Sequence, residues 1–271
     1  MAKLDSNAAW KEATGLVAAN RDMFLVLAGV FFLLPSLALS VFMGEPEMTP
    51  GMGREQMMAA LSAFYTDAWW LIALSSVLQV VGILSILTLM RDRSRPTVSE
   101  AIRAGLGGLL PYLAAQILFV LALSLVGGLT IGLAAVAAPA LAAVVAIVWF
   151  AFAVYAAMRL ILVAPIVAVE GQRNPIAALR RSWTLTQGNF WRIIGFVVLA
   201  MILFLVVLGV IMLLVGLVLA IVSSGETQRV LAAVVSSTLT ALAVLYFIGI
   251  LAAIHRQLAG PGKESLDETF A

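Results

Sequence analysis

The sequence predicts an all-α, polytopic membrane protein, and three observations carry this prediction. Of its 271 residues, 63% are hydrophobic and only 11% are charged. The mean hydropathy is +1.10, whereas about a quarter of the residues in a soluble domain are charged. No charged residue lies between Arg103 and Arg159, and this is enough chain for two helices across a hydrocarbon core about 30 Å thick. We therefore expect one integral membrane domain over residues 1–271.

Six apolar runs between charged and turn residues are each long enough to cross a bilayer. We place these spans at about 23–42, 68–90, 109–133, 141–162, 191–222 and 230–254. The fifth run is longer than a straight crossing needs, so we expect this helix to tilt.

The basic residues orient the bundle, because loops near spans keep Lys and Arg on the cytoplasmic side. Of the 16 Lys and Arg residues, the threading leaves only Arg54 and Arg229 on the outer side. The inner set is Lys3, Lys11, Arg21, Arg91, Arg93, Arg95, Arg103, Arg159, Arg173, Arg180, Arg181, Arg192, Arg256 and Lys263. We expect both termini in the cytoplasm. The formal net charge is only +2, so nucleic acid is not an expected partner.

Three stretches ahead of the first, third and fifth spans share one pattern. Each opens with a residue suited to cap a helix N-terminus, namely Asp5, Thr97 and Asn174. Counted from each cap, the fourth residue is alanine, the fifth is large and apolar, and the sixth is basic. These residues are Ala9, Trp10 and Lys11, then Ala101, Ile102 and Arg103, and then Ala178, Leu179 and Arg180.

The same stretches also share the place where a surface helix should turn into the membrane. Asn20 and Asn189 stand at equal distances from the first and third caps, and Pro111 and Tyr112 stand there in the middle copy. We therefore predict three cytoplasmic, interfacial amphipathic helices, each followed by a transmembrane hairpin. This unit would form a threefold repeat over 5–90, 97–169 and 174–256, related by an axis along the membrane normal.

Arg159 is the charged residue whose membrane depth the sequence leaves open. If the fourth span begins near residue 141, Arg159 reaches the cytoplasmic headgroups by snorkelling. If the span runs from about 148 to 169, Arg159 lies near the midplane and needs a partner. Pro165 favours the first interpretation, because proline ends or kinks a helix.

The segment 174–192 concentrates arginines on an amphipathic helix. Ile176, Leu179 and Trp183 would share one face of it, with Arg180 and Arg181 on the other. We predict that guanidinium groups in and near this segment bind lipid headgroup phosphates, and ordinary positive-inside anchoring is the alternative. The predicted headgroup-binding residues are Arg159, Arg173, Arg180, Arg181 and Arg192.

Other polar and small residues within the spans are few. Gln79 and Gln116 would either bond between helices or line a polar path. Gly128 and Gly132 predict a close helix contact near the turn between the third and fourth spans. There is no cysteine and one histidine, His255, and no catalytic motif. We therefore expect no metal, no cofactor and no enzyme activity.

The segment 174–192, together with Arg159 and the residues 162–165, resembles a bacterial membrane family. This is the YciC-like family of six-span inner-membrane proteins, related to the membrane domain that some bacteria fuse to a glycerophosphoryl diester phosphodiesterase. The resemblance is sharpest over about residues 155–194. It implies a six-helix fold in the bacterial inner membrane, without the catalytic domain of the fused proteins.

Three functions fit these observations to different degrees. The first is a non-catalytic protein that binds or organises glycerophospholipids, or membrane partners, at the cytoplasmic leaflet. The second is a transporter or channel for a small solute or lipid, with Gln79, Gln116 and Arg159 along its route. The third is an enzyme acting on lipids, which would need Arg159, Glu170, Asp92 or His255 to converge.

Overall fold

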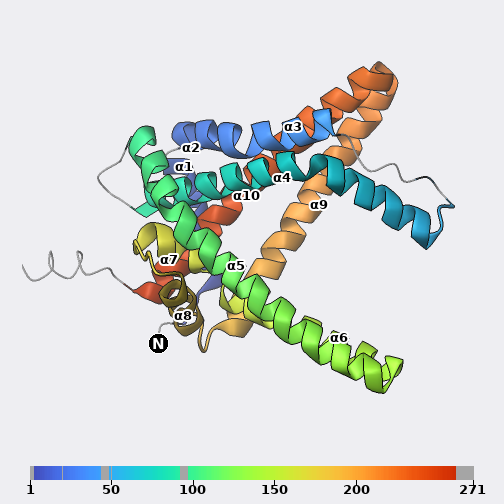
Figure 1. Cartoon of the computed structure of the whole chain (residues 1–271). Coiled ribbons are helices and arrows are strands. Elements are labelled where there is room, and N and C mark those ends of the chain that lie inside the picture. The colour runs from blue at the N-terminus through green and yellow to red at the C-terminus, as the bar shows by residue number, and fades with distance from the viewer. Residues whose placement is uncertain (1–2, 20, 44–48, 50, 92–96, 261–271) are drawn as a thin grey trace, which may run out of the picture.

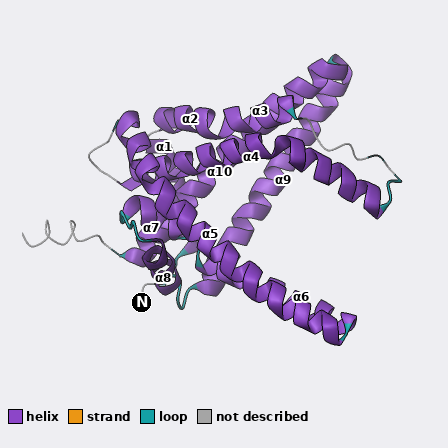
Figure 2. Cartoon of the chain, in the orientation of Figure 1, coloured by secondary structure: helices purple, strands orange, loops and turns teal. Residues whose placement is uncertain are grey.

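The structure of the chain, a computed structural model, describes all residues except 1–2, 20, 44–48, 50, 92–96 and 261–271 (Figure 1). All regular structure in this described part is helical (Figure 2). Within it, six helical stretches are long and apolar enough to cross a membrane, which confirms the predicted number. They cover Arg21–Phe42, Arg54–Arg91, Val98–Ala137, Pro139–Val169, Phe190–Val222 and Gly225–Ala259.

Most spans are single helices, but the first and fourth are composite. The first consists of α2 (Arg21–Ala28), a π-helical turn (Gly29–Leu33) and α3 (Leu34–Phe42). The fourth consists of α6 (Pro139–Arg159) and α7 (Val163–Val169). The single helices are α4 (Arg54–Arg91), α5 (Val98–Ala137), α9 (Phe190–Val222) and α10 (Gly225–Ala259). The second span was expected from about 68, and its helix begins at Arg54 because the polar residues ahead of the apolar run are also good helix formers.

The three predicted N-caps are confirmed. Asp5 Oδ1 accepts hydrogen bonds from the amides two and three residues on, at 2.9 and 3.1 Å. Asn174 Oδ1 does the same at 3.0 and 3.1 Å. Thr97 forms a capping box with Glu100. Side-chain oxygens satisfy the free amides of a helix start in this way.

The predicted breaks after the caps are only partly as expected. α1 (Ser6–Ala19) and α8 (Pro175–Leu185) are separate short helices, and α8 gives way to α9 across a turn that ends at Asn189. The middle stretch is not separate, because α5 continues through Pro111. A proline inside a helix removes one hydrogen bond and bends the helix without having to end it. The first turns of α5 indeed run in another direction from its long remainder in Figure 1. Asn20 lies outside the described residues.

The three capped stretches also share a burial pattern. The alanine four residues past each cap is fully buried, the next residue is half-buried and the basic residue after it is exposed. Eight residues past each cap lies a second small, buried residue that the pattern in the sequence did not reveal. These residues are Ala13, Gly105 and Ser182.

Each of these small residues lies against a different spanning helix. A Cβ on Gly249 of α10 would lie 3.2 Å from the carbonyl oxygen of Ala13. A Cβ on Gly105 would lie 2.9 Å from the carbonyl oxygen of Val81 in α4. Ser182 Oγ donates a hydrogen bond of 2.9 Å to the carbonyl oxygen of Arg159 in α6. The capped stretches are therefore packed onto the second helices of the hairpins.

The core lies at the end of the bundle that carries α1, α8 and the first turns of α5, which we call the arginine-rich end. There α4, α7 and α10 contact one another, through nearly continuous buried runs at 84–90, 162–167 and 248–255. Away from this end the α5–α6 hairpin and the outer parts of α9 and α10 extend in different directions (Figure 1). Most side chains of α5, α6 and α9 are exposed apolar groups, as lipid-facing helices require.

The close contact between the third and fourth spans exists, but the predicted pair does not form it. Nothing lies within 4 Å of a Cβ placed on Gly128 or Gly132. Gly127 instead lies directly against the indole of Trp149. Neighbouring residues of an α-helix point about 100° apart, so a shift of one position selects a different face.

Candidate functional site

Arg159 is the most unusual charged residue of the described structure. It ends α6, which begins at Pro139, and these twenty steps correspond to about 30 Å, one hydrocarbon thickness. This depth agrees with the interpretation that places Arg159 at the headgroups. Its exposure does not, because only 4% of the residue is accessible. Arg159 is therefore buried, and the favoured prediction that it snorkels is wrong.

Two aromatic rings hold the guanidinium group of Arg159. Its Cζ lies 4.7 Å from the ring centroid of Trp183 in α8 and 5.9 Å from that of Tyr155 in α6. These rings also contact each other edge to face, at 5.7 Å. The carbonyl oxygen of Arg159 accepts hydrogen bonds from Ser182 at 2.9 Å and Thr186 at 3.1 Å. α8 thus fixes the last turn of α6 and covers its arginine.

No acidic group in the described part of the chain balances this buried charge. Arg159 Nε is enclosed and has no hydrogen-bond partner, and no described carboxylate forms an ion pair with the guanidinium. Arginine stays protonated in proteins, so burial cannot be relieved by loss of the proton. An uncompensated buried charge is costly, and cation–π contacts with two rings offset only part of the cost. The position therefore favours an anion as a ligand.

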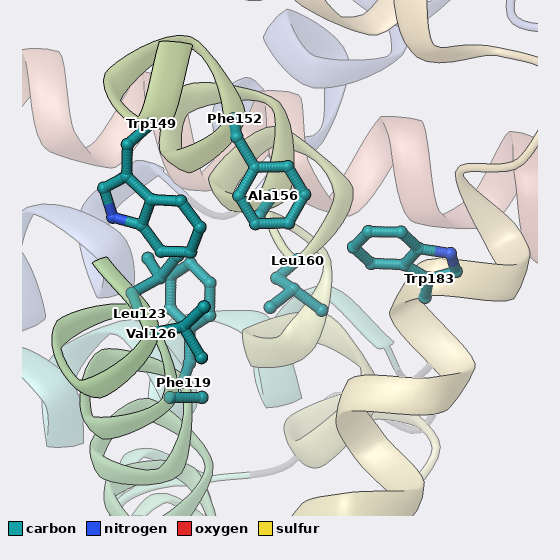
Figure 3. Close-up of a pocket in the computed structure, with 9 residues that line it drawn as sticks. Phe119, Leu123, Val126, Trp149, Phe152, Ala156, Leu160 and Trp183 are labelled. Carbon is teal, nitrogen blue, oxygen red and sulfur yellow. The ribbon is translucent and has the colours of Figure 1, made fainter. Parts of the chain in front are cut away.

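An apolar groove, whose lining residues are drawn in Figure 3, adjoins this arginine through Trp183. Side chains of α5, α6 and α8, together with Leu160 just after α6, line this open groove of about 360 Å³. Its lining residues are Phe119, Ala122, Leu123, Val126, Trp149, Phe152, Ala156, Leu160 and Trp183. Trp183 connects the groove to Arg159, because its ring lines the groove and also contacts the guanidinium.

The other four predicted headgroup arginines differ in their surroundings. Arg180 is exposed on α8, and the guanidinium of Arg173 packs over Gly107 and Gly108 of α5. Arg192 donates a hydrogen bond of 3.2 Å to the carbonyl oxygen of Leu4 and so ties down the N-terminal segment. Arg181 forms an ion pair with Glu170. All four lie in or beside α8 and α9 at the arginine-rich end.

The predicted polar path receives no support from the contacts of its glutamines. Gln116 Nε2 donates to the hydroxyl of Tyr112 at 2.8 Å, one turn away in the same helix. Its expected partner in a neighbouring helix is thus replaced by one in α5 itself. Gln79 is half-buried in α4.

A second charged cluster joins three elements at the arginine-rich end. Glu170 follows α7, and its two carboxylate oxygens meet His255 Nε2 of α10 at 3.0 Å and Arg181 Nε of α8 at 3.1 Å. Burial tends to raise the pKa of Glu170, but the hydrogen bonds from His255 and Arg181 outweigh it, so the pKa lies below its ordinary value. Both oxygens are thus occupied by partners within the chain, as in a structural pair.

Part of the set considered for an enzyme has therefore come together. Glu170 and His255 are in contact, whereas Asp92 lies outside the described residues. His255 is almost completely buried, and no group of three or more metal-ligating side chains occurs in the described ranges. Sequence reasoning named both residues but had no signal for their contact, because they are 85 positions apart.

The chain was compared with known protein families. Residues 134–258 match the family model of the membrane domain of glycerophosphoryl diester phosphodiesterase. This part of the chain is related to that membrane domain. The matched region contains α6 to α10 almost completely, including Arg159 and the Glu170–His255 pair. It is the membrane domain of those phosphodiesterases that matches, and the narrower YciC-like resemblance stays a prediction. Neither curated proteins nor solved structures gave a match.

Proposed function

We propose that this multi-pass membrane protein is non-catalytic and binds glycerophospholipid headgroups at the cytoplasmic leaflet of a bacterial inner membrane. The observation that carries the proposal is the guanidinium of Arg159, which is buried without a carboxylate partner in the described structure. A lipid phosphate supplies the missing negative charge, and its oxygens suit the forked donors of arginine. The relation to a membrane domain of glycerophosphodiester-cleaving enzymes supports the same ligand class.

The surroundings of Arg159 support a phosphate at this depth. Arg173, Arg180 and Arg192 provide further positive charge at the same end of the bundle. The anionic surface of the inner leaflet attracts such basic groups, by about 1 kcal/mol for each Lys or Arg. Neighbouring membrane proteins remain proposed partners through the exposed helices. Transport, the alternative function, is not favoured by any contact of Gln79 or Gln116 in the described part.

The proposal can be tested by lipid binding to the purified protein. Wild type and Arg159→Gln are delipidated, titrated with phosphatidylglycerol in a neutral detergent and examined by native mass spectrometry. We expect Arg159→Gln to bind at least about tenfold more weakly, which corresponds to about 1.4 kcal/mol. Arg54→Gln is the matched control, because it removes the same charge from an exposed site at the far end of α4.

The outcomes distinguish a specific lipid-binding site from general electrostatic attraction. Retention of wild-type affinity by Arg159→Gln overturns the proposal. Equal losses in Arg159→Gln and Arg54→Gln also overturn it, because the effect then follows net charge rather than the buried guanidinium. Arg159→Lys should recover only part of the affinity, since an ammonium group lacks the planar fork.

A further inference from the structure

The groove between α5, α6 and α8 has a depth that matches one leaflet of a bilayer. Its lining runs along α6 from Trp149 to Leu160. The ten residues from Trp149 to Arg159 span about 15 Å along the helix, and half of the hydrocarbon core is also about 15 Å. A chain that fills the groove would therefore reach from headgroup depth to the bilayer centre.

A buried charge lies next to the inner end of the otherwise apolar groove. The lining side chains are hydrophobic throughout, and aromatic residues stand at both ends, Trp149 at one and Trp183 at the other. Beside Trp183 lies the guanidinium of Arg159, whose Nε has no hydrogen-bond partner among the described residues. An apolar chain of leaflet length would fill the groove, and an anionic group at its inner end would lie near Arg159.

The walls of the groove are held in place by close packing. Trp149 of α6 is seated on Gly127 of α5, where any larger residue would displace the indole. The Trp149 ring also contacts the ring of Phe152, with centroids 5.2 Å apart. α8 closes the inner end, because Ser182 and Thr186 bind the carbonyl oxygen of Arg159. The cavity volume of about 360 Å³ lies within the usual range for ligand sites, about 300–1,000 Å³.

We infer that this groove holds one acyl chain of a cytoplasmic-leaflet glycerophospholipid whose phosphate is bound by Arg159. The inference rests on the proposed function and adds to it a defined seat for the lipid tail. It separates a bound lipid from annular lipid, which would cover all exposed apolar faces equally. The site should therefore select against charged headgroups without a tail.

The seat can be blocked without touching Arg159. Ala122 lines the groove from α5, and Ala122→Trp should fill it. Ala143→Trp is the matched control, because Ala143 is an exposed alanine of α6 that does not line the groove. We expect Ala122→Trp to weaken phosphatidylglycerol binding by about tenfold or more, and Ala143→Trp to leave it within about twofold of wild type.

A measurement on the wild-type chain guards against misfolding of the variant. Phosphatidylglycerol with a diazirine at the middle of one acyl chain is bound, irradiated and mapped by peptide mass spectrometry. We expect crosslinks to concentrate on 119–126 and 149–160, the two walls of the groove. Crosslinks that scatter over α9 and the outer half of α4 overturn the inference.

The two proposals fail in different ways. If Arg159→Gln lowers the affinity but Ala122→Trp behaves like Ala143→Trp, the acyl seat is wrong and headgroup binding stands. If Arg159→Gln binds like wild type, headgroup binding is wrong and the seat that rests on it falls as well.

Discussion

Replacing Arg159 by methionine should stabilise the protein in detergent and abolish its stabilisation by anionic lipid. In a neutral detergent, wild type keeps a buried charge that no described carboxylate balances. Methionine retains a long, flexible side chain that packs well against Tyr155 and Trp183. We therefore expect Arg159→Met to be more stable than wild type in detergent alone, and wild type to gain when phosphatidylglycerol is added.

The magnitude follows from opposing contributions at this position. Leaving one charge buried without a partner costs about 3–5 kcal/mol. The contacts with Trp183 at 4.7 Å and Tyr155 at 5.9 Å return about 0.5–2 kcal/mol in total when desolvated. The variant should thus gain about 1–4.5 kcal/mol in detergent. Lipid at one hundred times its dissociation constant should stabilise wild type alone, by about 2.7 kcal/mol.

The assay is the apparent melting temperature of both proteins with and without phosphatidylglycerol. For soluble proteins of similar size, 1 kcal/mol shifts the melting temperature by about 2–4 °C. Arg181→Met is the control of opposite sign, because it removes an arginine that has a partner in Glu170. The reasoning is refuted if Arg159→Met melts below wild type in detergent alone, or if added lipid stabilises both chains equally.

Three further predictions test the packing, the charged cluster and the threading. Gly105→Ala should cost about 1–3 kcal/mol by overpacking against α4, whereas Gly128→Ala, which meets nothing within 4 Å, should be neutral or stabilising in thermal melts. The pKa of Glu170 is lowered in the folded protein. Its pairs with Arg181 and His255 therefore stabilise the fold fully at pH values above the ordinary glutamate pKa, and this stabilisation is lost as the pH falls through the lower pKa of the folded state. Glu170→Gln should therefore make the stability less dependent on pH in acid. A single cysteine at the exposed position 176 should react only from the cytoplasmic side, and labelling from outside would contradict the threading.

The spans and caps could be predicted because their causes are local. An apolar run must cross the bilayer wherever it packs, so composition alone located six helices. Asp5, Thr97 and Asn174 cap helices through bonds to amides two or three residues away, and such bonds depend on no distant residue. The step from sequence to helix positions is therefore well determined.

The sequence named Arg159, Glu170 and His255 as candidates, but the geometry of the site could not be predicted, because it comes from contacts between elements. The depth of Arg159 follows from the length of α6, but its burial depends on Trp183, which α8 places over it. The contact of Glu170 with His255 depends on how α7 and α10 meet. The expected pair of Gly128 and Gly132 failed for a related reason. The spacing of small residues predicts a close contact, but only the orientation of the helix decides that Gly127 makes it.

The packing order of the capped stretches bears on the proposed repeat and on the site. The second stretch packs on α4 of the first unit, the third on α6 of the second, and the first on α10 of the third. This order closes on itself, as a cyclic threefold arrangement requires, and the triplication stays a prediction. The start of α1 is also joined to the last turn of α10, since the amide of Asp5 donates to Gln257 Oε1 at 3.1 Å.

Within this order the site belongs to one unit only. Where the first and third units present Ser85 and Gly249 to a capped stretch, the second unit presents Arg159. A small residue lets two helices approach closely and leaves no space. An arginine cannot be accommodated that way, so its carbonyl oxygen makes the contact with α8 and its side chain occupies the space between α6 and α8. On the predicted repeat, the second unit therefore places a large cation where the other two place a small side chain, and the buried charge of Arg159 lies at this contact with α8.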